Sequence, residues 1–354
     1  MHRLFRILFW AGFCGVLGCT AMGVPPVRQR PATDPNVSAA ENYLQKGDYR
    51  KALEALELAA RMKPRQDPEV YVMLAVCRLN LEDPRGALDA CEQGFQALPG
   101  NARIESYCAT LMSEVLSGDQ RYDRLSAALA RNPNSGALQK ALGRTLLEAH
   151  SNAPEDDLRT ERLLANARTL LPRDAEAQFL YGKWACVHQK EAACVQALSA
   201  SLSLTKPDNH AAVVLVNGMI GVAQDRLNHP RASVAAFERA LEAYTKLDPP
   251  VPEVPYEYVR FLAARSEHAA AQRVNAIILA RNPQFAPAHL EQARFLFRTG
   301  SIEPALVEAK LALQYSPPEK MQLRAIHSFL VKAYAALNRS ADAGFHQQWI
   351  EANP

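Results

Sequence analysis

A pattern of two short amphipathic helices joined by a turn recurs along most of this 354-residue chain, and it restricts the possible folds. The clearest copy covers residues 288–317. Gly300 lies in its middle, where a left-handed backbone costs glycine nothing, and Ser301 is a preferred residue for capping a following helix. Apolar and small residues recur three and four positions apart on both sides, which predicts one buried face per helix: Leu290, Ala293, Phe297, Ala305, Ala309 and Ala312.

Equivalent positions of this pattern recur 34 or 35 residues apart. One matching proline would mean little, but several independent positions in register are strong evidence for a repeat: Arg260 with Arg294, Ala271 with Ala305, Pro283 with Pro317, Ala52 with Ala87, and Pro64 with Pro99. The spacing resembles the tetratricopeptide repeat, a helix–turn–helix unit of 34 residues. The resemblance implies an all-α fold, namely a right-handed α-solenoid of about nine helix hairpins.

Packing explains why the pattern keeps small residues at fixed places. Alanine or glycine lets the two helices of one hairpin cross closely, and three alanine pairs suit such crossings: Ala40 with Ala52, Ala75 with Ala87, and Ala293 with Ala305. Larger side chains are expected between hairpins: Leu74, Tyr181, Phe237 and Leu241. One hairpin cannot bury its own apolar face, so the stability of the array must come from stacking.

The array divides at a proline-rich segment, residues 248–255. We expect repeats one to six over residues 36–248 and repeats seven to nine over residues 249–354. The segment is either a joint between two sub-arrays or a stiff loop on one array. Strand patterns, with long runs of alternating Val, Ile or Thr, are missing from the sequence.

The first 35 residues differ from the rest. Arg3 and Arg6 precede an apolar run of the length found in secretory signal peptides, too short to span a membrane, so residues 1–18 are expected to be a signal peptide. Cys19 ends a segment that resembles the lipobox of bacterial lipoproteins, which implies its lipidation and an outer-membrane location. Residues 19–35 then form a proline-rich tether. An uncleaved anchor and an ordinary signal peptide are the alternatives.

The net charge and the lack of enzyme motifs argue against two classes of function, nucleic-acid binding and catalysis. The formal charge is +3, and loss of Arg3 and Arg6 with the signal peptide leaves +1, which is no electrostatic footprint for nucleic acid. The sequence has no zinc-protease, nucleophile-elbow, Walker or dinucleotide-binding motif. We therefore expect a non-enzymatic protein without cofactor or metal.

Five cysteines follow Cys19, and none of them forms a C-x-x-C pair. They are either small buried hydrophobic residues or, in an oxidising compartment, partners in disulfides. Cys186 and Cys194 flank one hairpin turn, where two Cα atoms can approach within disulfide range, so they form the candidate pair.

The resemblance also implies a binding groove, because the first helix of each tetratricopeptide hairpin lines the concave side of the array. The position after its small residue points into the groove and holds five cations: Arg144, Lys183, Arg260, Arg294 and Lys332. Ordinary hydrated charge is the alternative for them. Three nearby aromatic residues suit a mixed acidic and apolar peptide or, alternatively, belong to the core: Phe179, Tyr256 and Phe297.

The leading hypothesis is a lipid-anchored scaffold of the bacterial envelope, facing the periplasm, that binds a protein segment in its groove. By analogy with lipid-anchored repeat proteins, outer-membrane assembly, pilus or secretion assembly and polysaccharide export are the pathways to consider. An envelope enzyme or carbohydrate-binding accessory that uses the groove, and a self-associating spacer, are the alternatives. The oligomeric state stays open.

Overall fold

The computed structural model describes residues 34–62, 67–149 and 154–353. Within these ranges the chain forms 18 helices and no strand, as the sequence predicted. The predicted signal peptide, Cys19 and most of the tether lie outside the described residues. Asp34 and Pro35, assigned to the tether, instead cap and begin the first described helix.

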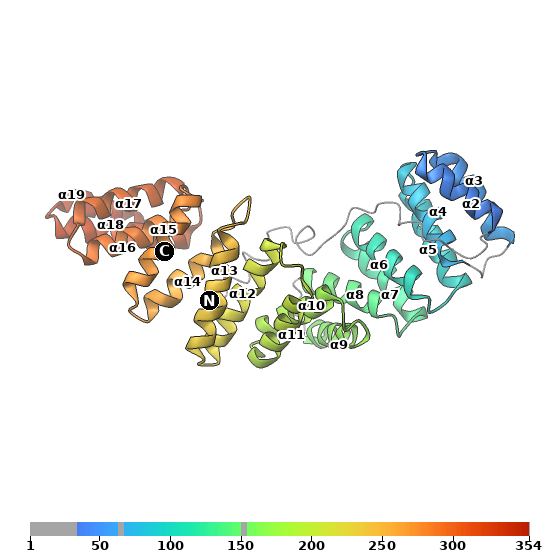
Figure 1. Ribbon diagram of the computed structural model, residues 1–354. Helices are drawn as coiled ribbons and strands as arrows, with labels where there is room; N and C mark the ends of the chain where they lie inside the picture. The colour runs from blue at the N-terminus through green and yellow to red at the C-terminus, as the bar shows by residue number, and fades with distance from the viewer. Residues whose placement is uncertain (1–33, 63–66, 150–153, 354) are drawn as a thin grey trace. The chain divides into compact units, whose positions relative to one another are not determined.

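Consecutive helices pair as antiparallel hairpins (Figure 1). The N-terminal hairpins are built from α2 (Pro35–Gln45), α3 (Tyr49–Met62), α4 (Pro68–Asn80), α5 (Pro84–Ala97), α6 (Ala102–Val115), α7 (Gly118–Arg131), α8 (Gly136–Ala149), α9 (Pro154–Leu170), α10 (Ala175–Val187) and α11 (Glu191–Leu204). The remaining hairpins are built from α12 (His210–Arg226), α13 (Pro230–Tyr244), α14 (Glu253–Ala264), α15 (His268–Arg281), α16 (Ala286–Arg298), α17 (Ile302–Tyr315), α18 (Lys320–Ala336) and α19 (Ser340–Ala352). The prediction of stacked helix hairpins is confirmed.

The helices fall into two compact units. The N-terminal unit contains α2–α11 and ends at Leu204, and the C-terminal unit contains α12–α19 and begins at Thr205. The division predicted at residue 248 lies between α13 and α14, inside the C-terminal unit, and these two helices pack against each other. The predicted sub-array boundary stays a prediction.

Small residues stand where the two helices of a hairpin cross. All six alanines of the three predicted pairs are completely buried. In the hairpin α10–α11 the close approach falls on Gly182, where an added Cβ would lie 2.7 Å from Leu198 Cδ2 and 3.2 Å from the Leu198 backbone nitrogen. Even a single Cβ is too close at this position unless Leu198 shifts, which explains why this hairpin has glycine where the three predicted pairs have alanine.

Seven hairpin turns in the described part of the chain share one backbone motif. The second residue after the first helix has a positive φ, and the next residue donates its N–H to a carbonyl five residues earlier, over 2.8–3.0 Å. This is the Schellman arrangement that satisfies free carbonyls at a helix end. Gly300 is one such residue, as predicted, but five of the seven are not glycine: Glu82, Gln189, Asn228, Ser266 and Asn338.

Short polar side chains cap the N-termini of many of the helices. Each accepts a hydrogen bond from a backbone N–H of the first turn, which satisfies a donor that the helix leaves free. The residues are Asp34, Asp67, Asp83, Asn101, Asp174 and Asn209. Ser301 holds the predicted N-cap position of α17 but makes no such side-chain bond.

Two disulfides fasten the N-terminal unit. Cys186 in α10 and Cys194 in α11 are bonded across their turn, with Cα atoms 5.0 Å apart. Cys91 in α5 and Cys108 in α6 are bonded between consecutive hairpins, with Cα atoms 5.6 Å apart. The fifth cysteine, Cys77, is a buried thiol whose pKa is raised to about 12 by desolvation. The Cys91–Cys108 pair was not predicted, because its spacing flanks a junction between hairpins rather than a turn inside one.

Candidate functional site

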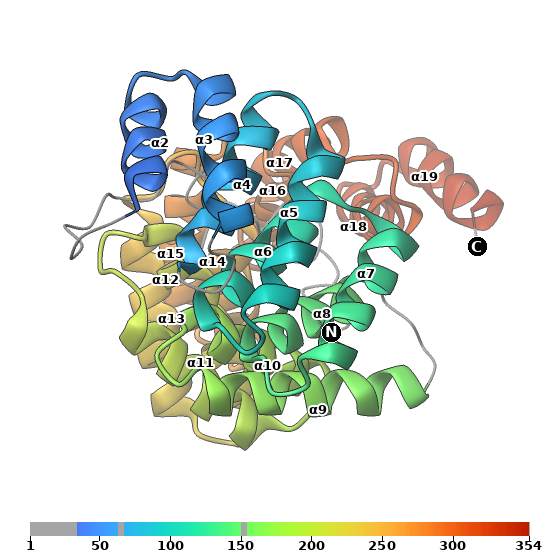
Figure 2. The same cartoon turned by 90° about the vertical axis from the view of Figure 1, so that its right-hand side faces the viewer.

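The first helices of successive hairpins form the candidate binding surface, which we call the A-helix face: α4, α6, α8 and α10 in the N-terminal unit, and α12, α14, α16 and α18 in the C-terminal unit. Within the units these helices contact one another directly, for example α6 with α8 (Figure 2) and α12 with α14. All five cations predicted for the groove lie on them.

In the N-terminal unit the cations of α8 bind the carboxylates that begin α10. Lys140 Nζ lies 2.6 Å from Asp174 Oδ2 and 3.0 Å from Glu176 Oε2. The Arg144 guanidinium also pairs with Glu176. The two acids occupy the N-cap and first turn of α10, where the helix dipole favours negative charge. Arg144 is therefore part of a charge network that ties two neighbouring A helices together.

Lys183 lies one helix further along, next to this network. Desolvation lowers its pKa to about 8, the charge of Arg144 adds to the shift, and Glu148 opposes it. On α6, desolvation raises the pKa of Glu114, and Arg144 partly offsets that shift. The electrostatic effect of Arg144 thus reaches α6 and α10, so the N-terminal A-helix face is a coupled charge cluster.

The C-terminal unit has a second cluster, on α14 and α16. Glu291 is only 6% exposed and pairs with Arg294 of its own helix. The Tyr256 hydroxyl of α14 lies 3.5 Å from the same carboxylate. Burial raises the pKa of Tyr256 well above its ordinary value, and the Glu291 charge raises it further. Arg260 binds Glu257 of α14 at 2.8 Å.

Three of the five cations predicted for the groove are paired with carboxylates of the protein itself. Arg144, Arg260 and Arg294 each bind a carboxylate, because acids stand three residues before two of them and on the following A helix for the third. Lys332 lies exposed on α18. The A-helix face presents paired charges of both signs rather than positive charge alone.

The three aromatic residues predicted for the groove have different surroundings. Phe179 is 2% exposed and its ring is buried inside the N-terminal unit, which favours the core alternative for this residue. Phe297 is half-buried and packs on Phe329 of α18, with ring centroids 5.7 Å apart, within the C-terminal core. Tyr256 is half-buried, with its ring edge-on to Phe285 and its hydroxyl near Glu291. Tyr256 is the one that adds a polar atom to the charge cluster.

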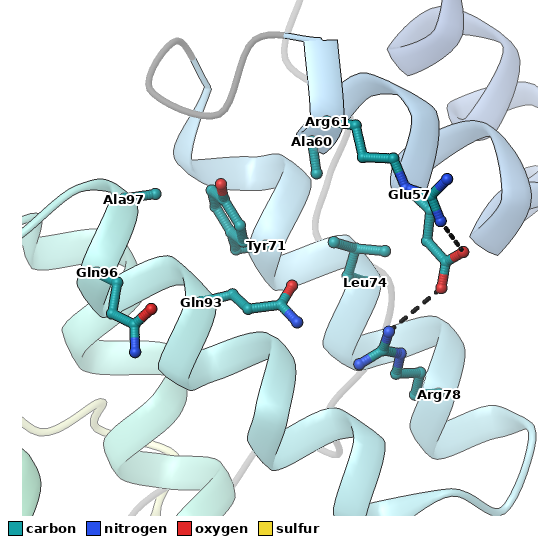
Figure 3. A pocket seen from close by; sticks show the side chains of 9 residues that line it. All are labelled: Glu57, Ala60, Arg61, Tyr71, Leu74, Arg78, Gln93, Gln96 and Ala97. Atoms are coloured by element: carbon teal, nitrogen blue, oxygen red, sulfur yellow. Dashed lines mark hydrogen bonds and ion pairs between the residues drawn. The ribbon is translucent and has the colours of Figure 1, made fainter.

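A pocket of about 470 Å³ lies away from these clusters, among α3, α4 and α5 (Figure 3). Leu74 and Tyr71 form its apolar part, and Gln93 and Gln96 lie at one side. At the other side Glu57 bridges Arg78, at 3.2 Å, and Arg61, at 3.9 Å. This carboxylate occupies both guanidinium groups, so the pocket offers a small apolar recess with amide donors and no unopposed charge.

Metal-binding clusters and membrane-spanning helices are missing from the part of the chain that the structure describes. Within residues 34–62, 67–149 and 154–353, no three His, Cys, Asp or Glu side chains are grouped so that they could hold a metal ion. None of the described helices is long and apolar enough to cross a membrane.

We did not predict the acidic partners of the groove cations from the sequence, although the spacing of two of them indicates an ion pair. Glu257 and Glu291 stand three residues before Arg260 and Arg294, and residues at this spacing are neighbours on a helix surface. Glu176 gives no such local signal, because its pairing with Arg144 depends on how two hairpins stack.

Comparison with known proteins identifies the repeat. Residues 36–66, which include most of α2 and α3, match the family model of the tetratricopeptide repeat. No curated protein matches the sequence significantly.

Solved structures with a similar fold include the yeast Tom70, with a TM-score of 0.49 and 16% identity over 95% of this chain and 70% of that chain. The C-terminal part of a TPR repeat-containing protein from Cytophaga hutchinsonii has a TM-score of 0.48 and 14% identity over 70% and 95% of the two chains. YrrB, described as a TPR protein with an unusual peptide-binding site, has a TM-score of 0.42 and 17% identity over 57% and 96%. The family-model match covers residues 36–66, and the helix hairpins described above continue beyond it along the described part of the chain.

Proposed function

We propose that this tetratricopeptide-repeat protein is a non-enzymatic scaffold of the bacterial envelope, anchored by a lipid on Cys19, that binds an extended segment of a partner protein on its A-helix face. Assembly of outer-membrane proteins, pili or secretion machinery, or polysaccharide export, is the class of process it would serve.

The observation that carries the proposal is the pair of charge clusters on the A-helix face. Each cluster joins neighbouring A helices, through Lys140 and Asp174 in one unit and through Tyr256 and Glu291 in the other. A partner carboxylate can replace a resident carboxylate on Arg144 or Arg260, and a partner amide can bond with the acids. An acidic segment with polar neighbours therefore suits this face better than a purely acidic one. Charge-assisted bonds of this kind are stronger than neutral ones.

Neutralising three cations of the A-helix face, two in the charge clusters and one on α18, tests the binding surface. Arg144→Gln, Arg260→Gln and Lys332→Gln together should weaken capture of the native partner from crosslinked envelopes at least tenfold, or about 1.4 kcal/mol. The fold should tolerate these changes, because Glu176 keeps Lys140 as a partner and Arg260 and Lys332 are exposed. Arg294 is left intact, since its loss would strand the buried Glu291.

The matched control carries the same kind of change on second helices: Arg50→Gln on α3, Arg231→Gln on α13 and Arg273→Gln on α15, all exposed. Capture should be unchanged in this control. An equal loss in both triple variants would contradict the A-helix face as the binding surface and would indicate a general charge effect.

The envelope location is supported by two independent features. The segment ending at Cys19 resembles a lipobox, and two disulfides join four of the five later cysteines. Disulfides persist in oxidising compartments and are rare in the bacterial cytosol.

Replacing Cys19 tests the anchor. An acyl chain contributes about 0.8 kcal/mol per buried CH2, so several chains hold a protein on a membrane firmly. Cys19→Ala should release the protein from the detergent-soluble membrane fraction or leave its precursor uncleaved. Cys14→Ala is the matched control and should change neither property. Unchanged fractionation of a normally processed Cys19→Ala protein would contradict lipidation.

A further inference from the structure

Two histidines join the last two helices of the C-terminal unit. His327 of α18 is 4% exposed and His346 of α19 is 8% exposed. Their Nδ1 atoms lie 2.9 Å apart, which is hydrogen-bond distance. No part of the proposed scaffold function uses this contact.

Aromatic stacking holds the same two rings. His327 is stacked on Trp349 of α19, with centroids 4.0 Å apart and ring planes 4° apart. His346 is stacked on Tyr334 of α18, with centroids 5.6 Å apart and planes at 14°. Each histidine thus rests on an aromatic ring of the opposite helix, and the Nδ1 contact joins the two stacks. α19 is fastened to α18 by this four-ring cluster.

Whether the two Nδ1 atoms form a hydrogen bond depends on how many protons the two imidazole rings carry. A neutral imidazole carries a hydrogen on one nitrogen and a lone pair on the other, whereas a protonated ring donates from both. The contact therefore needs one Nδ1 with a hydrogen and one with a lone pair. A single added proton is compatible with this arrangement, because the second ring still accepts. Protonation of both rings removes the acceptor and sets two cations against each other.

The surroundings compensate a second positive charge only in part. Burial lowers the pKa of both rings, and each ring is further affected by nearby charges. His346 lowers the pKa of His327. For His346, Asp342 of α19 raises the pKa, and Lys310 of α17 lowers it. Lys310 also lies over the Tyr334 ring, 5.9 Å from its centroid, and so adds positive charge next to the stack.

We propose that the His327–His346 contact is a proton-operated latch: acidification that places a proton on both rings releases α19 from α18, while the rest of the C-terminal unit stays folded.

The direction of the effect follows from linkage. Both folded-state pKa values lie below the ordinary histidine value, so the released helix binds more protons than the packed one as pH falls through this range. The stability of the packed state is therefore full above the ordinary histidine pKa and declines below it. The opening constant changes by at most about tenfold per pH unit for each proton gained.

His289, in the same unit, contacts two oxygen acceptors instead of a second histidine. Its Nδ1 lies 2.7 Å from Glu308 Oε2 of α17, and its Nε2 lies 2.8 Å from the Pro283 carbonyl oxygen. Both neighbours accept hydrogen bonds, so a ring with protons on both nitrogens satisfies both contacts. Neither contact requires a ring nitrogen as acceptor, so the hairpin α16–α17 should keep its packing throughout the pH range of the test. This hairpin is an internal reference for the test.

Hydrogen–deuterium exchange of the full chain, read by mass spectrometry between pH 7.5 and 5.0, tests the latch. After correction for intrinsic exchange, the opening constant of α19 amides should rise at least tenfold, and that of α16 and α17 should stay constant. A flat α19 profile would overturn the proposal, and so would a rise of the same size in α16 and α17, because that would be general acid unfolding.

A variant tests whether the His327–His346 pair causes the pH dependence of α19 opening. In His346→Asn the amide can bond to His327 without titrating, so the α19 opening constant should lose its pH dependence. His268→Asn, at an exposed histidine that begins α15, is the control and should keep the wild-type profile. The same pH dependence in His346→Asn would overturn the assignment.

Ring titration of the wild-type protein gives a second measurement that needs no variant. Nitrogen-15 NMR of the two imidazoles should record the second proton only at the pH where α19 loses protection. This result would support the latch even if His346→Asn left α19 unprotected at every pH. Two protonated rings under a fully protected α19 would overturn it.

Discussion

Replacing Phe237 with alanine is expected to destabilise the C-terminal unit by about 3–5 kcal/mol, the usual cost of truncating a buried aromatic residue. Phe237 of α13 is 2% exposed and stacks on Tyr258 of α14 at 5.1 Å, with Phe261 at 5.3 Å. The ring also fills the space beside Gly221 of α12, where an added Cβ would lie 2.9 Å from it. One side chain thus joins three helices, and its removal leaves a cavity that rigid neighbours cannot close.

Residue-resolved hydrogen exchange measures this loss, because it separates α12–α14 from the helices of the N-terminal unit. Phe345→Ala is the matched control: its ring is 64% exposed, so the change should stay within about 0.5 kcal/mol. A loss below about 1 kcal/mol for Phe237→Ala would mean that the three helices close over the cavity.

Removing the Cys91–Cys108 disulfide is expected to destabilise the N-terminal unit by about 3 kcal/mol, and removing Cys186–Cys194 by about 2.5 kcal/mol, because a crosslink restricts the conformational freedom of the unfolded chain. The larger value belongs to the longer loop, since the cysteines are 17 residues apart in the first pair and 8 in the second. Double alanine variants, unfolded in denaturant with and without reductant, give both values.

Cys77→Ala serves as the control for the disulfide experiment. It removes a buried thiol but keeps both crosslinks, so its stability should respond to reductant as strongly as that of the unaltered chain. Reductant that leaves the unaltered protein at full stability would contradict a structural role for the two disulfides.

The hairpins could be predicted from the sequence because their determinants are local. Ala293 and Ala305 mark a helix crossing through their own size, and the apolar period on either side marks the two helices. Only some of the residues with a left-handed backbone in the turns could be predicted from the sequence. Gly300 indicates a left-handed backbone, whereas Glu82, Gln189 and Ser266 take the same conformation because the Schellman bonds of the turn require it. A non-glycine residue there costs roughly 1–2 kcal/mol, which the bonds of the turn can offset, so the sequence can vary at this position.

The candidate site was predictable in position but not in electrostatic character. The repeat register placed Arg144 and Arg294 on first helices, and the structure agrees. Whether such a cation is paired depends on its neighbours in space: Arg294 has its acid on the same helix, but Arg144 finds Glu176 on the next hairpin. The His327–His346 contact depends on how α19 is rotated against α18. No periodicity in the sequence records that rotation.

The two crosslinks also bear on how the N-terminal unit would yield to a pulling force. A stack of hairpins lengthens by peeling, and each residue released adds about 3.3–3.6 Å of extended chain. The Cys91–Cys108 bond, with its 17-residue separation, withholds roughly 60 Å of that length, and Cys186–Cys194 withholds roughly 27 Å. The first bond also ties the hairpin α4–α5 to the hairpin that follows it. A force that peels the chain from α2 would therefore pass through this bond from α5 directly to α6, and the residues between the two cysteines would stay unextended.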